Sequence, residues 1–251
     1  YYAGTPVVPD GAYVVAADGG LDHTRELGIV PDVVVGDFDS LEGRPPRTDV
    51  RTITLPSLKD DPDMLSALKV GWAAGCREFH VYGGLGGRID HTISGIQLMT
   101  LLAGHGASGY LYGDGLIVTA ITDGKLSFPA HPVPEDGRMV SAFSHSDVSL
   151  GVNEPGLKYE LKDDTLTNTM VQGVSNEFRD GIDAAISVEH GTLIVTFPIE
   201  VALPQVSRFH EFSGGIGKLD TEVSKLLVRR PDACPGFRGF TPLAQYGKPH
   251  I

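Results

Sequence analysis

The chain has 251 residues, 41% hydrophobic and 21% charged, which is the balance of a globular protein that can bury a sizeable core. Its formal net charge of -12 argues against nucleic acid or an anionic membrane surface as a partner, because both favour clustered Lys and Arg. No apolar run approaches the roughly 18 residues of a membrane helix, and we expect a cytoplasmic protein.

The N-terminal half alternates strand and helix signals. The run Ala12–Ala16 is β-prone, residues 21–27 have a helical pattern that Gly28 closes, and Val33–Val35 is apolar on both faces. Strands without polar alternation are typical of a parallel sheet that helices cover on both sides. We therefore expect an α/β domain over residues 1–130, with an open, mostly parallel sheet flanked by helices.

Two aspartates follow the second of these strands. If the chain stays extended, Asp37 and Asp39 point to the same side, and Ser40 comes next. Mg²⁺ uses one or two carboxylates together with water and phosphate oxygens, which is what this turn supplies. The alternative is a surface turn in which an aspartate caps the next element.

Residues 60–75 give the clearest helical pattern, which Gly75 ends. Asp60, Asp61 and Asp63 lie at its start, where carboxylates satisfy free backbone amides whatever the function, and Asp60 or Asp61 is the expected cap. Asp37 and Asp39 precede these residues in the chain, with one short predicted strand between them. We therefore expect one of these residues to cap the helix while another reaches a metal.

A glycine-rich loop joins a strand predicted at 79–82 to a helix predicted at 92–103. It lacks the Gly-Lys-Ser/Thr of a Walker loop, but its glycines let backbone N–H groups approach a phosphate, and Arg88 offers a bidentate fork. The alternative is a flexible turn with a surface arginine. The candidate phosphate ligands are Gly84, Gly86, Gly87 and Arg88, followed by Asp90.

An electrostatic argument favours a metal at this acidic edge. Two like charges about 4 Å apart repel by roughly 4 kcal/mol at an effective dielectric of 20, so several aspartates would oppose the binding of a triphosphate. One or two Mg²⁺ ions reverse the sign of that interaction. The sequence therefore predicts a magnesium and phosphate site.

The second half is β-prone. Short strands are predicted at 110–112, 116–120, 139–143, 147–150, 157–161, 184–189 and 192–197. The Pro- and Gly-rich segment 129–137 is the expected domain boundary, which gives a smaller antiparallel β-sandwich over 137–198. Residues 199–251 form a tail without an assigned role, in which 219–228 has the pattern of one helix.

Three residues of this half have side chains that could hold a heterocycle. Tyr159 could stack on a cationic ligand, and Ser175 with Asn176 could hydrogen-bond to it. Such residues are more often core tyrosines and turn residues. Sequence physics alone does not assign them a function.

Six short motifs follow one another along the chain: Ala-Asp-Gly-Gly, Gly-Asp-Phe-Asp-Ser, Lys-Asp-Asp-Pro-Asp, Gly-Gly-Leu-Gly-Gly-Arg-Ile-Asp-His, Gly-Leu-Lys-Tyr and Gly-Val-Ser-Asn-Glu-Phe. Taken in this order, they resemble the thiamine pyrophosphokinase family of the bacterial type, also called thiamin diphosphokinase. The resemblance covers about Ala3 to Pro198. It implies an N-terminal nucleotide-binding domain, a C-terminal β-sandwich and a homodimer with thiamine sites between subunits.

The resemblance also implies an activity and residue roles. The family transfers the pyrophosphoryl group of ATP to the hydroxyl of thiamine with Mg²⁺, giving thiamine diphosphate and AMP. By position, the metal residues would be Asp37, Asp39, Asp60, Asp63 and Asp90, with Arg88 steadying the transferred group and Asp37, Asp63, Arg88 and Asp90 forming the catalytic set. Asp18, Gly19 and Gly20 would line the nucleotide side, together with Asp39, Ser40, Asp60 and the loop glycines, and Tyr159, Ser175 and Asn176 of the partner subunit would hold thiamine.

Two alternatives stay open. One is a pyrophosphokinase for another heterocyclic alcohol, such as a hydroxymethylpterin, with the same phosphate machinery. The other is a protein that binds a nucleotide or a thiamine phosphate without catalysis. Release of AMP separates the enzymes from the binding protein, and the choice of alcohol separates the two enzymes.

Overall fold

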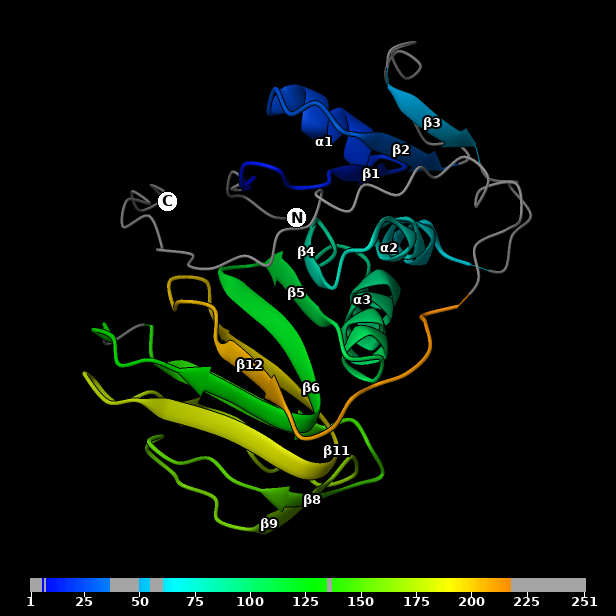
Figure 1. Ribbon diagram of the computed structural model, residues 1–251. Helices are drawn as coiled ribbons and strands as arrows, with labels where there is room; N and C mark the ends of the chain where they lie inside the picture. The colour runs from blue at the N-terminus through cyan, green and yellow to red at the C-terminus, as the bar shows by residue number, and fades with distance from the viewer. Residues whose placement is uncertain (1–5, 7, 37–49, 55–60, 135–136, 218–251) are drawn as a thin grey trace. The chain divides into compact units, whose positions relative to one another are not determined.

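The computed structural model describes residues 6, 8–36, 50–54, 61–134 and 137–217 (Figure 1). Along the chain, its helices and strands are β1 (Val15–Ala17), α1 (Gly20–Glu26), β2 (Val33–Gly36), β3 (Arg51–Thr54), α2 (Asp63–Ala74), β4 (Glu78–Tyr82), α3 (Ile89–Ala103), β5 (Ser108–Gly113), β6 (Leu116–Phe128), β7 (Met139–Ser144), β8 (Val148–Val152), β9 (Asp164–Thr167), β10 (Asn176–Glu177), β11 (Ala184–Pro198) and β12 (Gln205–Arg208). The predicted α/β class is confirmed.

The chain divides into two compact units. We call the first the parallel-sheet unit, whose described residues lie within Ala3–Phe79 and at 214–217. The second is the large-sheet unit, whose described residues lie within His80–Ser213. Each unit has its own sheet and its own buried apolar residues.

The parallel-sheet unit contains three strands in the order β1-β2-β3, each pair parallel. The central strand is buried throughout, because successive side chains point to opposite faces and a helix packs on each face. Val34 packs with Leu21 of α1 on one face. Val33 and Val35 pack with Val70 of α2 on the other. The apolar run without polar alternation is thus explained by burial on both sides.

Helix α2 ends as predicted but begins differently. Gly75 adopts a φ of +105°, and its N–H donates to the carbonyls of Gly71 and Trp72, which closes the helix. At the other end Pro62 occupies the N-cap position, and no side chain from the part of the chain that the structure describes caps the helix. The expected cap at Asp61 is wrong, because its carboxylate pairs with Lys69 instead.

The large-sheet unit is built on a nine-stranded sheet. Its main order is β10-β7-β11-β6-β5-β4, with β12 pairing β6 and with β8 pairing both β11 and β9. The pairs along β10-β7-β11-β6-β5 are antiparallel. Helix α3 packs against β5 and β6, beside which it lies in Figure 1.

Long strands hold this sheet together. The strands predicted at 184–189 and 192–197 are one strand, β11, which pairs with β6 along its length. Its register shifts between Val188 and Thr192, where Gly191 has a φ of +118°. Because β6 and β11 share one sheet, the boundary expected at 129–137 falls inside the large-sheet unit. The predicted division at 1–130, 137–198 and 199–251 stays a prediction.

Two further expectations differ from the structure. Residues 157–161 do not form a strand but a turn segment with one isolated bridge, Leu157 to Phe178. Gly156, with a φ of +80°, turns the chain before strand pairing can extend. Strand β12 was not predicted, and it pairs with β6 in the segment that the sequence left unassigned. The helix expected at 219–228 lies outside the described residues. None of the described helices is long and apolar enough to cross a membrane.

Candidate active site

Asp18 follows β1 at the carboxyl edge of the parallel sheet. Its N–H donates to the Val35 carbonyl at 2.8 Å, and its φ is +42°. A Cβ at Gly36 would lie 3.1 Å from Asp18 Cα, so the end of β2 passes close by. Gly19 and Gly20 lead into α1, and a Cβ on either would meet nothing within 4 Å. The segment predicted to line the nucleotide is therefore an open turn at the sheet edge.

The acidic residues at the start of α2 have different environments. Asp63 is the first helical residue, where a negative charge complements the helix dipole. Asp61 accepts a hydrogen bond from Lys69 Nζ at 2.5 Å, and the Lys69 side chain is 10% exposed. Asp61 is thus neutralised locally by Lys69.

Several predicted site residues lie outside the described residues. They are Asp37, Asp39, Ser40 and Asp60. Their assignments to metal, nucleotide and catalysis stay predictions. Among the described residues, Asp63 belongs to the parallel-sheet unit and Asp90 to the large-sheet unit.

The glycine-rich loop joins β4 to α3, as predicted. Gly83, Gly86 and Gly87 have φ values of +80°, +81° and +67°, which residues with a Cβ rarely adopt. Between them Leu85 is buried, and a Cβ on Gly113 of β5 would lie 2.4 Å from Leu85 Cβ. The loop therefore combines a left-handed backbone with an apolar anchor on the neighbouring strand.

Gly84 is the second fixed point of this loop. It is buried, and a Cβ on Gly95 of α3 would lie 3.4 Å from its carbonyl oxygen. The loop thus turns tightly over the first part of α3. Its outer part, from Gly87 to Asp90, is exposed. A backbone fixed at its base and open at its rim suits the binding of an anion.

Arg88 and Asp90 form an ion pair at this rim. Arg88 Nε lies 3.1 Å and Nη2 2.5 Å from the two Asp90 oxygens, and the side chains are 71% and 61% exposed. The hydrogen bond from Arg88 lowers the pKa of Asp90, and the same bond raises the pKa of Arg88. Water screens an exposed pair of this kind, so exchanging partners for a phosphate or a cation costs little.

The structure leaves the predicted metal site untested. Within the described ranges, no group of three or more His, Cys, Asp or Glu side chains could hold a metal ion. Carboxylate oxygens are nevertheless the donors that Mg²⁺ prefers, so Asp63 and Asp90 each carry a group of the kind that binds this ion. The five-residue metal assignment stays a prediction.

The structure brings the three predicted heterocycle-binding residues together, although 15 residues of chain separate Tyr159 from Ser175. Tyr159 N–H donates to Asn176 Oδ1 at 3.0 Å, and Ser175 precedes Asn176. The Tyr159 side chain is exposed, as is Ser175. Ser175 has a φ of +56°, a strained conformation for a residue with a Cβ, and its N–H donates to Ser141 Oγ.

Asn176 differs from its two neighbours because it is only 4% exposed. Its Oδ1 accepts from the N–H groups of Tyr159 and Glu177, at 3.0 and 2.9 Å. Its Nδ2 donates to the Tyr159 carbonyl and to Glu154 Oε2, both at 2.8 Å. An amide has two donor and two acceptor positions, and all four are used within the chain.

Glu154 was not predicted as a site residue. It is 1% exposed and lies shortly after β8. Burial raises its pKa to about 7, the hydrogen bond from Asn176 lowers it, and the charge of Asp164 raises it. Nothing in the local sequence distinguishes a buried glutamate from an exposed one, because the groups that bond Glu154, at Leu161 and Asn176, come later in the chain.

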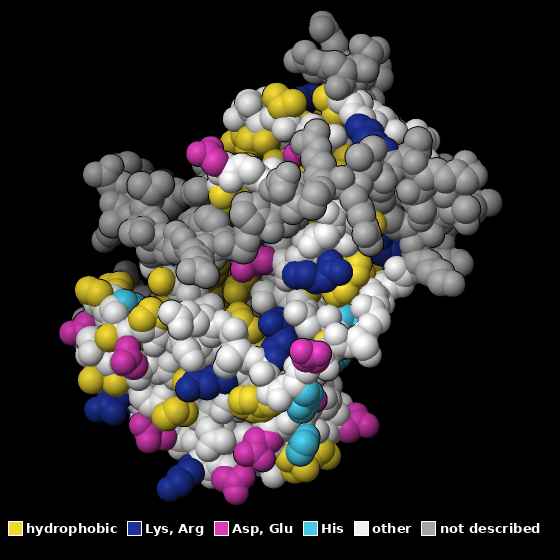
Figure 2. All heavy atoms as spheres, viewed as in Figure 1, with side chains coloured by type: hydrophobic (Ala, Val, Ile, Leu, Met, Phe, Trp, Pro, Cys, Tyr) yellow, Lys and Arg dark blue, Asp and Glu magenta, His cyan; other side chains and the backbone are white. Residues whose placement is uncertain are grey.

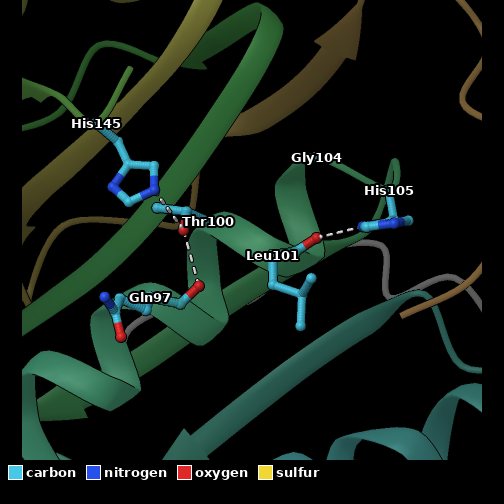
Figure 3. Close-up of a pocket in the computed structure, with 6 residues that line it drawn as sticks. All are labelled: Gln97, Thr100, Leu101, Gly104, His105 and His145. Atoms are coloured by element: carbon cyan, nitrogen blue, oxygen red, sulfur yellow. Dashed lines mark hydrogen bonds between the residues drawn. The ribbon is translucent and has the colours of Figure 1, made fainter. Parts of the chain in front are cut away.

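Two surface hollows lie away from the predicted residues. One, of about 380 Å³, is lined by α3 residues, by Gly104 and His105 just after α3, and by His145 (Figure 3). His145 Nε2 lies 3.3 Å from Thr100 Oγ1, and His105 Nδ1 lies 2.9 Å from the Leu101 carbonyl. The second hollow, of about 410 Å³, includes Lys125 and Asp183. Neither hollow contains a predicted site residue.

The described surface has mixed charge. Figure 2 shows acidic and basic side chains interspersed over the face in view, with histidines among them. Proteins that bind nucleic acid gather Lys and Arg along one face. The face in view therefore gives no support to such a partner.

Comparisons with known proteins agree with the motifs. Residues 7–108 match the family model described as thiamin pyrophosphokinase, catalytic domain. The matched segment runs from before β1 to the start of β5, so it includes the Asp18 turn, α2 and the whole glycine-rich loop. The resemblance to this family, inferred from the motifs, is confirmed. No curated protein sequence matches the chain.

Solved structures share the fold. Thiamine pyrophosphokinase from Bacillus subtilis superposes with a TM-score of 0.63 at 22% identity, over 73% of this chain and 86% of that one. Thiamin pyrophosphokinase from Candida albicans gives 0.61 at 15% identity, over 74% and 80%. The yeast enzyme gives 0.60 at 14% identity, over 78% and 84%. At these identities the likeness concerns the fold.

Proposed function

We propose, from the premise that residues 7–108 belong to the thiamin pyrophosphokinase catalytic-domain family, that this chain transfers the pyrophosphoryl group of ATP to the hydroxyl of thiamine. The products are thiamine diphosphate and AMP, and the reaction uses Mg²⁺. The chain is accordingly a transferase that makes thiamine diphosphate. A cytoplasmic location and the absence of nucleic-acid and membrane partners stay predictions.

The observation that carries this proposal is the glycine-rich loop inside the matched segment. Three left-handed glycines and the buried Leu85 give the loop one backbone path, and the rim presents Arg88 and the start of α3. Backbone N–H groups at such a junction can approach phosphate oxygens closely. Arg88 can add a bidentate contact to an oxygen pair when it leaves Asp90.

The chemistry follows from positioning and charge. The thiamine hydroxyl oxygen bonds to the β-phosphorus of ATP, the bond between that phosphorus and the α-phosphate oxygen breaks, and AMP leaves. The hydroxyl proton passes to an aspartate carboxylate, Asp63 or Asp90. Arg88 steadies the negative charge of the transferred group. Bound Mg²⁺, held by the predicted aspartates, would neutralise phosphate charge.

The thiamine side of the site is proposed at Tyr159 and Ser175. Both are exposed and both flank Asn176. An exposed aromatic ring is a suitable face for the cationic thiazolium of thiamine. In this proposal Tyr159 and Ser175 contact thiamine directly. Asn176 does not, because its polar atoms already form hydrogen bonds within the chain.

We also propose that two copies of the chain form a homodimer. The segment beside β7 exposes Met170, Val171 and Val174, which are 60%, 82% and 49% exposed, and Met139 in β7 itself is 56% exposed. Strand β10 ends the main strand order of the sheet and consists of two residues. An apolar surface at a sheet edge favours association.

One assay tests the proposed reaction. The protein is mixed with ATP, Mg²⁺ and thiamine, and the products are identified by mass. We expect thiamine diphosphate and AMP. Thiamine monophosphate with ADP would make the protein an ordinary kinase, and nucleotide binding without AMP would support the non-catalytic alternative. A parallel reaction with hydroxymethylpterin tests the other pyrophosphokinase.

A further inference from the structure

The starting observation is a buried carboxyl group with half of its hydrogen-bonding capacity unused. Glu154 N–H donates to the Leu161 carbonyl at 3.0 Å, and its Oε2 accepts from Asn176 Nδ2 at 2.8 Å. Its Oε1 is buried and has no hydrogen-bond partner among the described residues. Burying a carboxyl group with an oxygen that lacks a partner costs free energy, so the position of Glu154 calls for a physical explanation.

The partner of this carboxyl group, Asn176, holds the backbone of Tyr159 in turn. The Asn176 amide holds both backbone groups of Tyr159, accepting from its N–H and donating to its carbonyl. At Tyr159 it thereby continues, through a side chain, the backbone pairing that Lys158 makes with Glu177. A flipped amide would set its NH₂ against the Tyr159 N–H and its oxygen against the Tyr159 carbonyl, so only one orientation works.

Glu154 completes this arrangement. The second proton of the Asn176 amide points to Glu154 Oε2, and without that acceptor a buried donor would lose its partner. The neighbouring chain is also fixed, since Lys158 N–H donates to the Glu177 carbonyl at 2.9 Å. Tyr159 therefore has a clamped backbone, while its side chain is 61% exposed.

We propose that Glu154 is a positioning residue, which holds the Asn176 amide in one orientation and thereby fixes Tyr159 for contact with a cationic heterocyclic alcohol. The identity of that ligand as thiamine rests on the proposed function. The clamp itself rests only on the contacts described above. Glu154 touches no substrate in this scheme and acts through Asn176 and the Tyr159 backbone.

The clamp responds to pH. Burial, followed by the charge of Asp164 in β9, raises the pKa of Glu154 to about 7, although the bond from Asn176 opposes this shift. Within the described part of the chain, Asp164 is the charged group that acts on Glu154. Ionised Glu154 gives Asn176 a charge-assisted hydrogen bond, and protonation weakens it. The clamp is therefore expected to tighten as the pH rises through neutrality.

The first test needs no substrate. In the full chain labelled with ¹⁵N, the side-chain NH₂ signal of Asn176, identified by its loss in Asn176→Ser, is followed from pH 5.5 to 8.5. We expect it to shift with a midpoint near neutral pH in the unmodified protein and in Glu160→Gln, a control from the same loop, where Glu160 is exposed. Glu154→Gln should abolish the titration. A signal that ignores pH, or that still titrates in Glu154→Gln, overturns the link.

The second test uses turnover. Glu154→Leu, which removes the acceptor, should raise the KM for thiamine about tenfold, the effect of losing one hydrogen bond to a charged group. The KM for ATP should stay within about twofold, and Glu154→Gln, which retains an acceptor, should restore most of the loss. The KM for thiamine should fall between pH 6 and 8 in the unmodified protein and stay flat in Glu154→Gln.

The outcomes separate the two proposals. If KM for thiamine and for ATP rise together, or neither changes, Glu154 does not position the thiamine contact and the inference is wrong. If the unmodified protein releases no AMP, the proposed function fails, and the amide titration still decides whether Glu154 sets Asn176. Should Glu154→Leu not fold, the Gln variant carries both readouts.

Discussion

The glycine-rich loop and the Asn176 clamp are built in opposite ways, although both were predicted to contact ligand. The loop from Gly83 to Asp90 fixes its base with Leu85 and leaves the charged rim exposed. The clamp buries its amide and uses every hydrogen-bonding position within the chain. A polar residue in a motif can therefore either meet the ligand or hold the residue that does, and only burial and hydrogen bonding distinguish the two.

The largest effect should come from the exposed rim. Replacing Arg88 with Ala should lower kcat by about 10²–10³-fold, because a group that stabilises charge in the transition state is lost. Stability should not change, since the Arg88 side chain is 71% exposed and its ion pair with Asp90 is at the surface. Steady-state assays and urea unfolding measure the two effects.

Arg88→Lys is the control and should recover only part of the rate, because it lacks the bidentate fork. Unchanged turnover in Arg88→Ala would remove Arg88 from the phosphate site.

The buried carboxyl should show itself in the pH dependence of stability. At low pH, Glu154 is neutral in the folded and in the unfolded protein. Its ordinary pKa is 4.5, and its pKa in the folded protein is about 7. As the pH rises, Glu154 therefore ionises first in the unfolded chain. Stability is therefore lost between these values. From pH 5.5 to 8, Glu154→Gln should gain roughly 2 kcal/mol relative to the unmodified protein, measured by urea unfolding. Glu160→Gln should show no such relative gain. If the two variants behave alike, Glu154 is not buried as described.

The base of the loop offers a steric test of the same contrast. In Gly113→Ala the new Cβ would lie 2.4 Å from Leu85 Cβ, so the loop must move or the strand must shift. We expect a loss of roughly 1–3 kcal/mol in the free energy of unfolding and a higher KM for ATP. Gly104→Ala is the matched control, since its Cβ would meet only backbone oxygens at 3.4 Å and beyond. Equal behaviour of the two variants would mean that Leu85 does not anchor the loop.

The smallest effect concerns the charge beside Tyr159. Lys158 Nζ lies 5.4 Å from the centre of the Tyr159 ring and 2.6 Å from Glu177 Oε1, which neutralises it. Glu177→Gln should leave the lysine charge facing a cationic ligand and raise the KM for thiamine about two- to threefold at low salt. Lys158→Gln should lower that KM or leave it unchanged. The same change in both variants, or no dependence on salt, would rule out an electrostatic effect.

Local patterns predicted the elements that depend on neighbouring residues. The apolar run at Val33–Val35 required cover on both faces, and Gly75 ends α2 because it can adopt a left-handed φ. The junction of β4, the loop and α3 was also predictable, since glycines separate a β-prone run from a helical one. The start of α2 was not predictable in the same way, because Asp61 could either cap the helix or pair with Lys69. In the structure its carboxylate pairs with Lys69, eight residues later.

Distant pairings set the rest. The continuity of β11 across Gly191 depends on β6 pairing on both sides of the bulge, and the backbone of Tyr159 is held by the side chain of Asn176. Neither relation has a local signal, because the partners lie dozens of residues apart or use a side chain instead of a backbone. The same holds for Glu154, whose bonding groups come later in the chain.

By itself, the sequence determined the α/β class, the strand-to-helix junctions and the resemblance to a family, because these depend on hydrophobic period, on glycine and on short motifs. Tertiary structure alone decided which of the polar residues are exposed and which are buried and hydrogen-bonded to their neighbours. The physical reason is that burial and hydrogen-bond saturation are properties of a neighbourhood. Asn176 and Ser175 are adjacent in the chain, yet folding buries one and leaves the other exposed.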